Sequence, residues 1–204
     1  MKVISLGCNC EVAFFLERYE QETFPFDWIW CTLDFVYETM AHDYLAFTEC
    51  EKLNAVWQPP YPHTYIFNNN CPGKSPRVCS AVSLHDADQH TPDQYQAAIP
   101  TINAKYARRF ARLYTILQSL SPEEPIFLVR KVLNNDQGAV RRDPDTVPKL
   151  NALATLLLTK FPATNWTLCV VNNEHTLSDT TLAHDRVRIF GSFDQLAHYI
   201  ELFS

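Results

Sequence analysis

The sequence predicts an α/β fold: a single domain, residues 1–204, in which a mainly parallel sheet lies between two layers of helices. Apolar, β-branched stretches alternate along the chain with stretches of ten or more residues that have helical spacing. Several strand-like stretches are almost continuously apolar, which is typical of strands buried on both faces. No internal repeat, low-complexity tract or linker divides the chain, and 204 residues suffice to bury one core.

The chain begins with a strand that is followed directly by a helix. Lys2–Gly7 reads KVISLG, an apolar and β-branched run that predicts a buried strand. The amphipathic stretch Cys10–Tyr19 predicts the helix. The next segment, Phe24–Trp28, is a rigid aromatic turn, because Pro25 excludes helix there and favours an extended conformation before it.

A second helix and a turn-rich region follow. Leu33–Phe47 has apolar residues at helical spacing and a capping residue at its start, Thr32 or Asp34. The turn-rich region contains one short strand, Tyr65–Asn68, and the alternating stretch Arg77–Leu84 predicts another.

A long helix opens the second half of the chain, with Thr91 as N-cap and Pro92 at its first position. We expect Pro100 to kink or split it, and the second part, Thr101–Leu120, carries apolar residues at spacings of four, three and four. The last third repeats the alternation: strand Pro125–Leu133, helix Thr146–Phe161, strands Trp166–Asn172 and Arg186–Phe190, and helix Asp194–Phe203.

Composition and charge exclude some classes of function. A net charge of -6 and a pI near 5.6 argue against a protein that holds nucleic acid through bulk charge. No stretch approaches the roughly 20 apolar residues of a membrane span, and no signal-peptide pattern follows Met1. The seven scattered cysteines suit reduced thiols better than a disulfide framework. We therefore expect a cytoplasmic protein with no nucleic-acid or membrane partner.

Cys10 is the first candidate for chemistry. It lies where a predicted strand is followed by a predicted helix. The first N–H groups of a helix, which have no partner within the helix, and the helix dipole stabilise a thiolate at this position. Most of the seven cysteines must fill the core, and Cys8 at the strand end belongs with those. His85 is the candidate base, because it follows the predicted strand Arg77–Leu84 and ligands gather at strand ends in open α/β sheets. The alternative for His85 is a hydrogen-bonded residue of the sheet rim.

A third group would orient the imidazole of His85. Asp27 is the favoured candidate, as a lone carboxylate in an apolar turn, with a local turn or cap as its alternative role. Asp86, Asn172 and Asn173 are the other options; the last two follow a predicted strand.

Several arginines are candidates for contacting an anionic group. Arg108 and Arg112 share one helical face, with Arg109 between them. Arg130 lies within a buried strand, where an arginine has a carboxylate partner or lines a site for an anion. A solvated helix face and one internal salt bridge are the simpler alternative, and we rate it above the anion site.

No metal site and no cofactor are predicted. Cys8-x-Cys10 lacks the second close pair or the histidine pair of a zinc site. The chain has 4 glycines and neither of the usual phosphate-binding glycine motifs.

Five short motifs together resemble a bacterial domain-of-unknown-function family described as papain-like cysteine peptidases. They are SLGCNC, PFDW, HD, YARR and VR, and they occur in that order over roughly residues 3–133. The resemblance implies Cys10 as nucleophile and His85 as general base, and it demotes Cys8, which falls at a variable position. It also offers an α+β papain-like fold as the alternative to the α/β fold.

The leading hypothesis is a cysteine-dependent hydrolase or acyltransferase that acts on an amide or thioester carbonyl of a small molecule or peptide. Backbone N–H groups near Asn9 would stabilise the oxyanion, while Arg109 and Arg130 would select an acidic or phosphorylated substrate. One alternative is a rim-site enzyme for a phosphate or sugar that does not use the thiol. Another is a binding module in which these polar residues only fix the fold.

Overall fold

The structure is a computed structural model, and it describes residues 1–8, 10–19, 22–42, 54–58, 63–67, 81–83, 92–119, 122–132, 144–173, 177 and 182–203. His85, Asp86 and Asn9 lie outside these residues. No helix within the described parts of the chain is long and apolar enough to cross a membrane.

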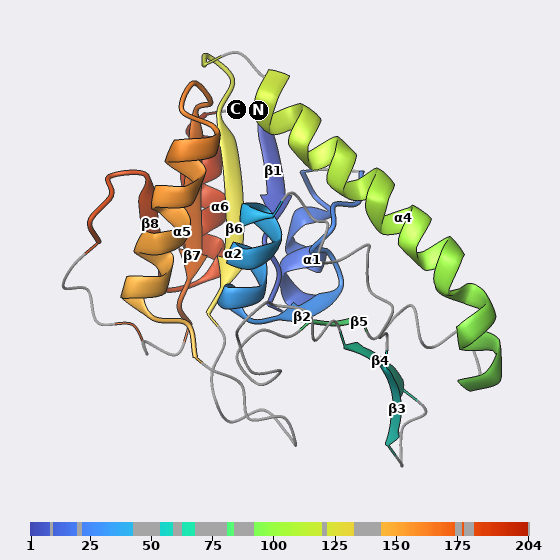
Figure 1. The fold of residues 1–204 in the computed structure, drawn as a ribbon. Coiled ribbons are helices and arrows are strands. Elements are labelled where there is room, and N and C mark those ends of the chain that lie inside the picture. Colours follow the sequence, from blue (N-terminus) through green and yellow to red (C-terminus); the bar gives the residue numbers. More distant parts are fainter. Residues whose placement is uncertain are drawn as a thin grey trace.

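A four-stranded parallel sheet forms the centre of the protein, as the α/β prediction requires (Figure 1). Its strands follow the order β1-β6-β7-β8, so β1 and β7 both flank β6. All three pairings are parallel, which demands a crossover between successive strands. The bounds are β1 Lys2–Ser5, β6 Ile126–Lys131, β7 Trp166–Val171 and β8 Val187–Phe190.

Helices cover both faces of this sheet and make three layers (Figure 1). Side chains alternate between the faces of a strand, so β6 sends Phe127 and Val129 to one face and Leu128 to the other. The first face packs against α1 and α6, and the second against α2, α4 and α5. The bounds are α1 Cys10–Leu16, α2 Leu33–Ala41, α4 Pro92–Ser119, α5 Val147–Lys160 and α6 Phe193–Glu201.

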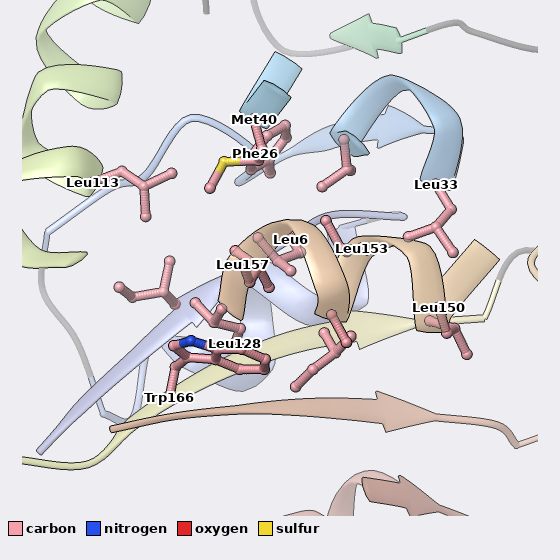
Figure 2. Close-up of a cluster of buried hydrophobic side chains, with 14 of the residues drawn as sticks. Leu6, Phe26, Leu33, Met40, Leu113, Leu128, Leu150, Leu153, Leu157 and Trp166 are labelled. Atoms are coloured by element: carbon pink, nitrogen blue, oxygen red, sulfur yellow. The ribbon is translucent and has the colours of Figure 1, made fainter. Parts of the chain in front are cut away.

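The larger core cluster shows why α5 lies flat on the sheet. Leu150, Leu153 and Leu157 recur at helical spacing, are fully buried, and belong to the same cluster as Leu128 and Trp166 on the strands below (Figure 2). Burying side chains of this size contributes roughly 1.5–3 kcal/mol each. The predicted helix Thr146–Phe161 is therefore confirmed, with Thr146 and Phe161 as its flanking residues.

Two smaller sheets lie outside the central one. β2 (Ile29–Cys31) pairs antiparallel with β5 (Ala81–Ser83), and β3 (Asn54–Gln58) pairs antiparallel with β4 (His63–Phe67). The strand expected over Arg77–Leu84 thus exists in part, but it does not belong to the central sheet. The strand before His85 was expected in the parallel sheet, but Ala81–Ser83 pair antiparallel with β2 instead.

α4 departs from the predicted split at Pro100. The helix runs unbroken over 28 residues, although an interior proline removes one backbone hydrogen bond and costs about 3 kcal/mol. Four side chains after the proline, Tyr106, Phe110, Leu113 and Leu117, are buried at the predicted spacings of four, three and four. Their burial against the core outweighs the cost of the proline.

The start of α2 is as predicted and its end is not. The Thr32 hydroxyl accepts a hydrogen bond from the Phe35 N–H at 3.2 Å, which identifies Thr32 rather than Asp34 as the N-cap. The helix ends at Ala41, and residues 43–50, where we expected it to continue, lie outside the described residues.

Candidate functional site

The turn between β1 and α1 is held by specific local contacts. The Ser5 hydroxyl accepts a hydrogen bond from the Gly7 N–H at 2.9 Å and donates one to the Phe26 carbonyl at 3.5 Å. Gly7 has φ of 77°, in the left-handed region, and Cys8 follows with φ of 115°. A Cβ at position 7 would lie 2.6 Å from the Cys31 sulfur, so only glycine fits this close approach.

The thiols of the described residues divide into buried and accessible ones. Cys8, Cys31 and Cys169 are buried, and Cys10, the first residue of α1, is partly exposed. Burial raises the pKa of Cys8 to about 12 and also raises the pKa values of Cys31 and Cys169. These three thiols are therefore protonated at neutral pH and shielded from reagents. Cys10 is the described thiol that a substrate can reach.

Arg130 binds three separate segments of the chain from within the core. The guanidinium is fully buried and makes a bidentate ion pair with Asp145, Nε to Oδ2 and Nη2 to Oδ1, both at 2.9 Å. Its other N–H groups donate to the Leu6 carbonyl at 3.1 Å, the Cys31 carbonyl at 3.0 Å and the Cys31 sulfur at 3.6 Å. All five donors of the guanidinium are thus engaged.

This geometry corrects the expectation that Arg130 contacts substrate. Its charge is compensated inside the protein, and its donors hold the end of β1 against β2. The internal ion pair was the alternative that the sequence favoured, but the sequence did not identify Asp145 as its partner. Cys31 was not singled out either. A carboxylate between two prolines, just before a predicted helix, was the only available signal for Asp145.

The Phe24–Trp28 turn is closed by Asp27. The Asp27 Oδ2 atom accepts a hydrogen bond from the Phe24 N–H at 2.6 Å, and the Asp27 N–H donates to the Phe24 carbonyl at 3.2 Å. Trp28 then takes φ of 63°, and Phe26 packs edge-on against Phe110 with ring centroids 5.7 Å apart. Asp27 is 6% exposed. Its alternative role as a local turn residue is therefore present in the structure.

One arginine of α4, Arg112, contacts the residues just before this turn. The Arg112 Nη1 group donates to the Thr23 carbonyl at 2.7 Å, and its Nε lies 3.4 Å from Glu22 Oε1. Arg109 is partly exposed and stacks over the Tyr106 ring at 5.6 Å. The PFDW turn and α4 are thus neighbours in space, through the Phe26–Phe110 ring contact and the Arg112 contacts just before the turn.

The pairing of β2 with β5 brings Ser83 beside Ile29, just after this turn. Ile29 pairs with Ser83; in the sequence, Asp27 comes two residues before Ile29 and His85 two residues after Ser83. The Ile29 and Phe26 carbonyls each lie 3.4 Å from the position of a Cβ on Gly7. Gly7 and Ser83 therefore both lie against the segment 26–29.

The asparagines after β7 lie further away. Asn172 is buried, donates its Nδ2–H to the Leu177 carbonyl at 3.3 Å, and donates its N–H to the Phe190 carbonyl at 2.8 Å. Asn173 is exposed. Because β6 separates β7 from β1, the two strands are about 10 Å apart. The structure does not bring either asparagine to the turn that leads to Cys10.

Within the described residues, no three histidine, cysteine or acidic side chains gather as metal ligands would. A parallel sheet covered on both faces, with an accessible thiol at the start of the first helix, defines an α/β protein with a candidate cysteine site. The chain belongs to the family described as "Putative papain-like cysteine peptidase (DUF1796)", which matches residues 1–176. Comparison with curated proteins and with solved structures found no match.

Proposed function

We propose that this protein is a cysteine-dependent hydrolase or acyltransferase, with Cys10 as nucleophile, His85 as general base and Asp27 as the residue that orients His85. The proposal is carried by the partly exposed Cys10 thiol at the start of α1, and by the pairing of Ile29, two residues after Asp27 in the sequence, with Ser83, two residues before His85. Membership of a family described as a cysteine peptidase supports the same reaction class.

The chemistry follows from these roles. Cys10 transfers its proton to His85 and attacks the carbonyl carbon of an amide or thioester, so a C–S bond forms as the carbonyl π electrons move to oxygen. Backbone N–H groups from Asn9 to Glu11 stabilise that oxyanion. The tetrahedral intermediate collapses and expels the amine or thiol, which takes the proton from His85. Water or another acceptor then attacks the acyl-enzyme and regenerates Cys10.

A carboxylate accepts several hydrogen bonds, so Asp27, which accepts one from the Phe24 N–H, has the chemistry that the orienting role requires. Of the two arginines considered for an anionic substrate group, Arg109 is better supported, because it is partly exposed while every donor of Arg130 is engaged inside the protein. Arg130 is better described as a positioning residue for the turn that presents Cys10.

The test is the thiol pKa of Cys10, measured from the pH dependence of iodoacetamide labelling and peptide mass spectrometry. In the wild type we expect a value below the ordinary value of about 8.5. His85→Ala should raise it, whereas His198→Ala, which removes an exposed histidine of α6, should not. If Cys10 titrates normally in all three proteins, the cysteine mechanism is refuted.

One specific observation favours the alternative of a non-catalytic module: Arg130 and Asp27 both have structural partners inside the protein. In that case Asp27→Asn lowers stability and leaves the Cys10 pKa unchanged. The rim-site alternative for a phosphate or sugar predicts instead that Cys10→Ser retains full activity. The same titration and one Cys10→Ser assay separate these alternatives from the proposed mechanism.

A further inference from the structure

Lys131 is the last residue of β6, and its side chain reaches the first turn of α1. Side chains alternate along the strand, so Lys131 lies on the same face as Val129, which packs against α1, while Arg130 lies on the opposite face. The Lys131 Nζ lies 2.7 Å from the Glu11 Oε2, and Glu11 directly follows Cys10. An ion pair thus joins the end of β6 to the residue beside the candidate nucleophile.

The carboxyl ends of β1 and β6 are the point of the sheet at which the chain leaves toward opposite faces. The two strands are neighbours, and β1 is followed by α1 on one face while β6 is followed by α5 on the other. In open α/β sheets, ligands bind outside the strand ends at such a point. Cys10 begins α1 and Lys131 ends β6, so both belong to the elements that border this point.

The two charges of the ion pair are unequally screened. The Lys131 side chain is 12% exposed and that of Glu11 is 53% exposed, so water weakens the field of the carboxylate more than that of the ammonium. The positive field reaches the turn before α1: burial raises the pKa of the Cys8 thiol, and Lys131 opposes that rise. Cys8 precedes Cys10 by two residues, so the same ammonium acts on the start of α1.

Two further charges act on this turn, from the opposite face of the sheet. Arg130 opposes the rise in the pKa of Cys8 that burial causes, and Asp145 adds to it. These two side chains form the internal ion pair described above, so their effects on the turn counteract each other. Of the two cations, Lys131 is the one that acts from the α1 face.

We propose that Lys131 is a positioning residue for the reaction: its ion pair with Glu11 fixes the first turn of α1, and its positive charge favours the thiolate form of Cys10. The inference rests on the proposed function, since it takes Cys10 as the nucleophile. In that function His85 removes the thiol proton and Asp27 orients His85. Lys131 stabilises the negative charge that remains on the sulfur.

The test is the pKa of the Cys10 thiol in variants of the ion pair, measured by the same iodoacetamide titration. The reagent is uncharged, so the substitutions do not steer its approach. Lys131→Met leaves the Glu11 carboxylate beside Cys10 and should raise the thiol pKa by about 0.5 unit. Glu11→Gln leaves the ammonium and should lower it by a similar amount. If the ion pair acts only by holding the turn, both variants break it and shift the pKa in the same direction.

Two controls separate charge from packing. Lys131→Arg keeps the charge and should retain the pKa of the wild type. Lys149→Met removes a lysine that also has a partly buried side chain and an ion pair, with Asp34 at 2.6 Å, on the other face of the sheet, and it should leave the Cys10 pKa unchanged. If Lys131→Met does not fold, Lys131→Gln takes its place, since it also removes the charge.

The inference is overturned if Lys131→Met leaves the Cys10 pKa unchanged or lowers it, or if Lys131→Met and Glu11→Gln shift it in the same direction. His85→Ala in the same titration tests the proposed function separately. A thiol pKa that responds to His85→Ala and not to Lys131→Met overturns only the inference. One that responds to Lys131→Met and not to His85→Ala contradicts the proposed Cys10–His85 pair and supports the effect of Lys131.

Discussion

Replacing Arg130 with methionine tests whether the Arg130 guanidinium holds the end of β1 against β2. The substitution keeps an unbranched side chain in the core but removes the guanidinium that faces Asp145, whose side chain is 0% exposed. Breaking a buried ion pair by removing one partner costs about 3–5 kcal/mol. The loss also takes donors from the Leu6 and Cys31 carbonyls. We therefore expect Arg130→Met to lower the free energy of unfolding by at least about 3 kcal/mol, a large part of a typical total of about 5–15 kcal/mol.

The double variant Arg130→Met/Asp145→Leu separates the cost of the unpaired Asp145 carboxylate from the other losses of stability in Arg130→Met. It removes the uncompensated carboxylate, and apolar replacement of a buried pair is often neutral or stabilising by about 1–4 kcal/mol. The two backbone carbonyls still lack their donors, at about 1–3 kcal/mol each. The double variant should therefore be less stable than the wild type and more stable than Arg130→Met alone.

The measurement is urea unfolding followed by tryptophan fluorescence, in which the buried Trp166 reports on the core. Arg188→Met is the matched control: an exposed arginine on β8 of the same sheet, for which we expect a change within about 0.5 kcal/mol. If Arg130→Met does not fold, Arg130→Lys replaces it, since lysine keeps the charge and loses the bidentate geometry. This account of Arg130 is refuted if Arg130→Met lowers the free energy of unfolding by less than about 1 kcal/mol. It is also refuted if the loss in the double variant equals the sum of the losses in Arg130→Met and Asp145→Leu.

Three further predictions concern the same region. Gly7→Ala should lower the free energy of urea unfolding by about 1–3 kcal/mol, because Gly7 has a positive φ and lies close to the Cys31 sulfur. The double variant Gly7→Ala/Cys31→Ala should recover only the part of this loss that is due to the clash with the Cys31 sulfur. Burial raises the pKa of the Cys8 thiol in the folded protein above its value of about 8.5 in the unfolded chain. The neutral thiol therefore contributes fully to stability below about pH 8.5, and this contribution is lost as the pH rises above that value. Unfolding free energy should thus fall from pH 8 to 10, and less steeply in Cys8→Ala; equal slopes would contradict this. Burial, then Arg109, lowers the pKa of Lys105 to about 8, so NMR of the ¹³C-methylated amine should show a midpoint near that value. Arg109→Gln should raise it; an unchanged midpoint would show that Arg109 does not act on Lys105.

The elements of the fold follow largely from local sequence. The strand runs KVIS and IFLVRK and the helical spacing of α5 are strong periodic signals, and the structure has them within a few residues of the predicted ends. Three-residue strands such as β2 carry too few residues for a periodic signal, and the length of α4 depended on packing beyond Pro100. Prediction from local sequence is therefore least accurate for short strands and for helix ends whose position depends on tertiary contacts.

Some features of the candidate site also follow from local sequence, and others depend on the tertiary structure. Local sequence is enough to predict that Cys10 begins a helix after an apolar strand, because the spacing of apolar residues changes there from that of a strand to that of a helix. It also indicated that an arginine within a buried strand requires a partner. The tertiary structure was needed to show that this partner is Asp145, that residues 26–29 lie beside Gly7, and that β5 pairs with β2. These contacts join residues far apart in the chain, and which pairs meet is set by the order and direction of the strands, which no local pattern encodes.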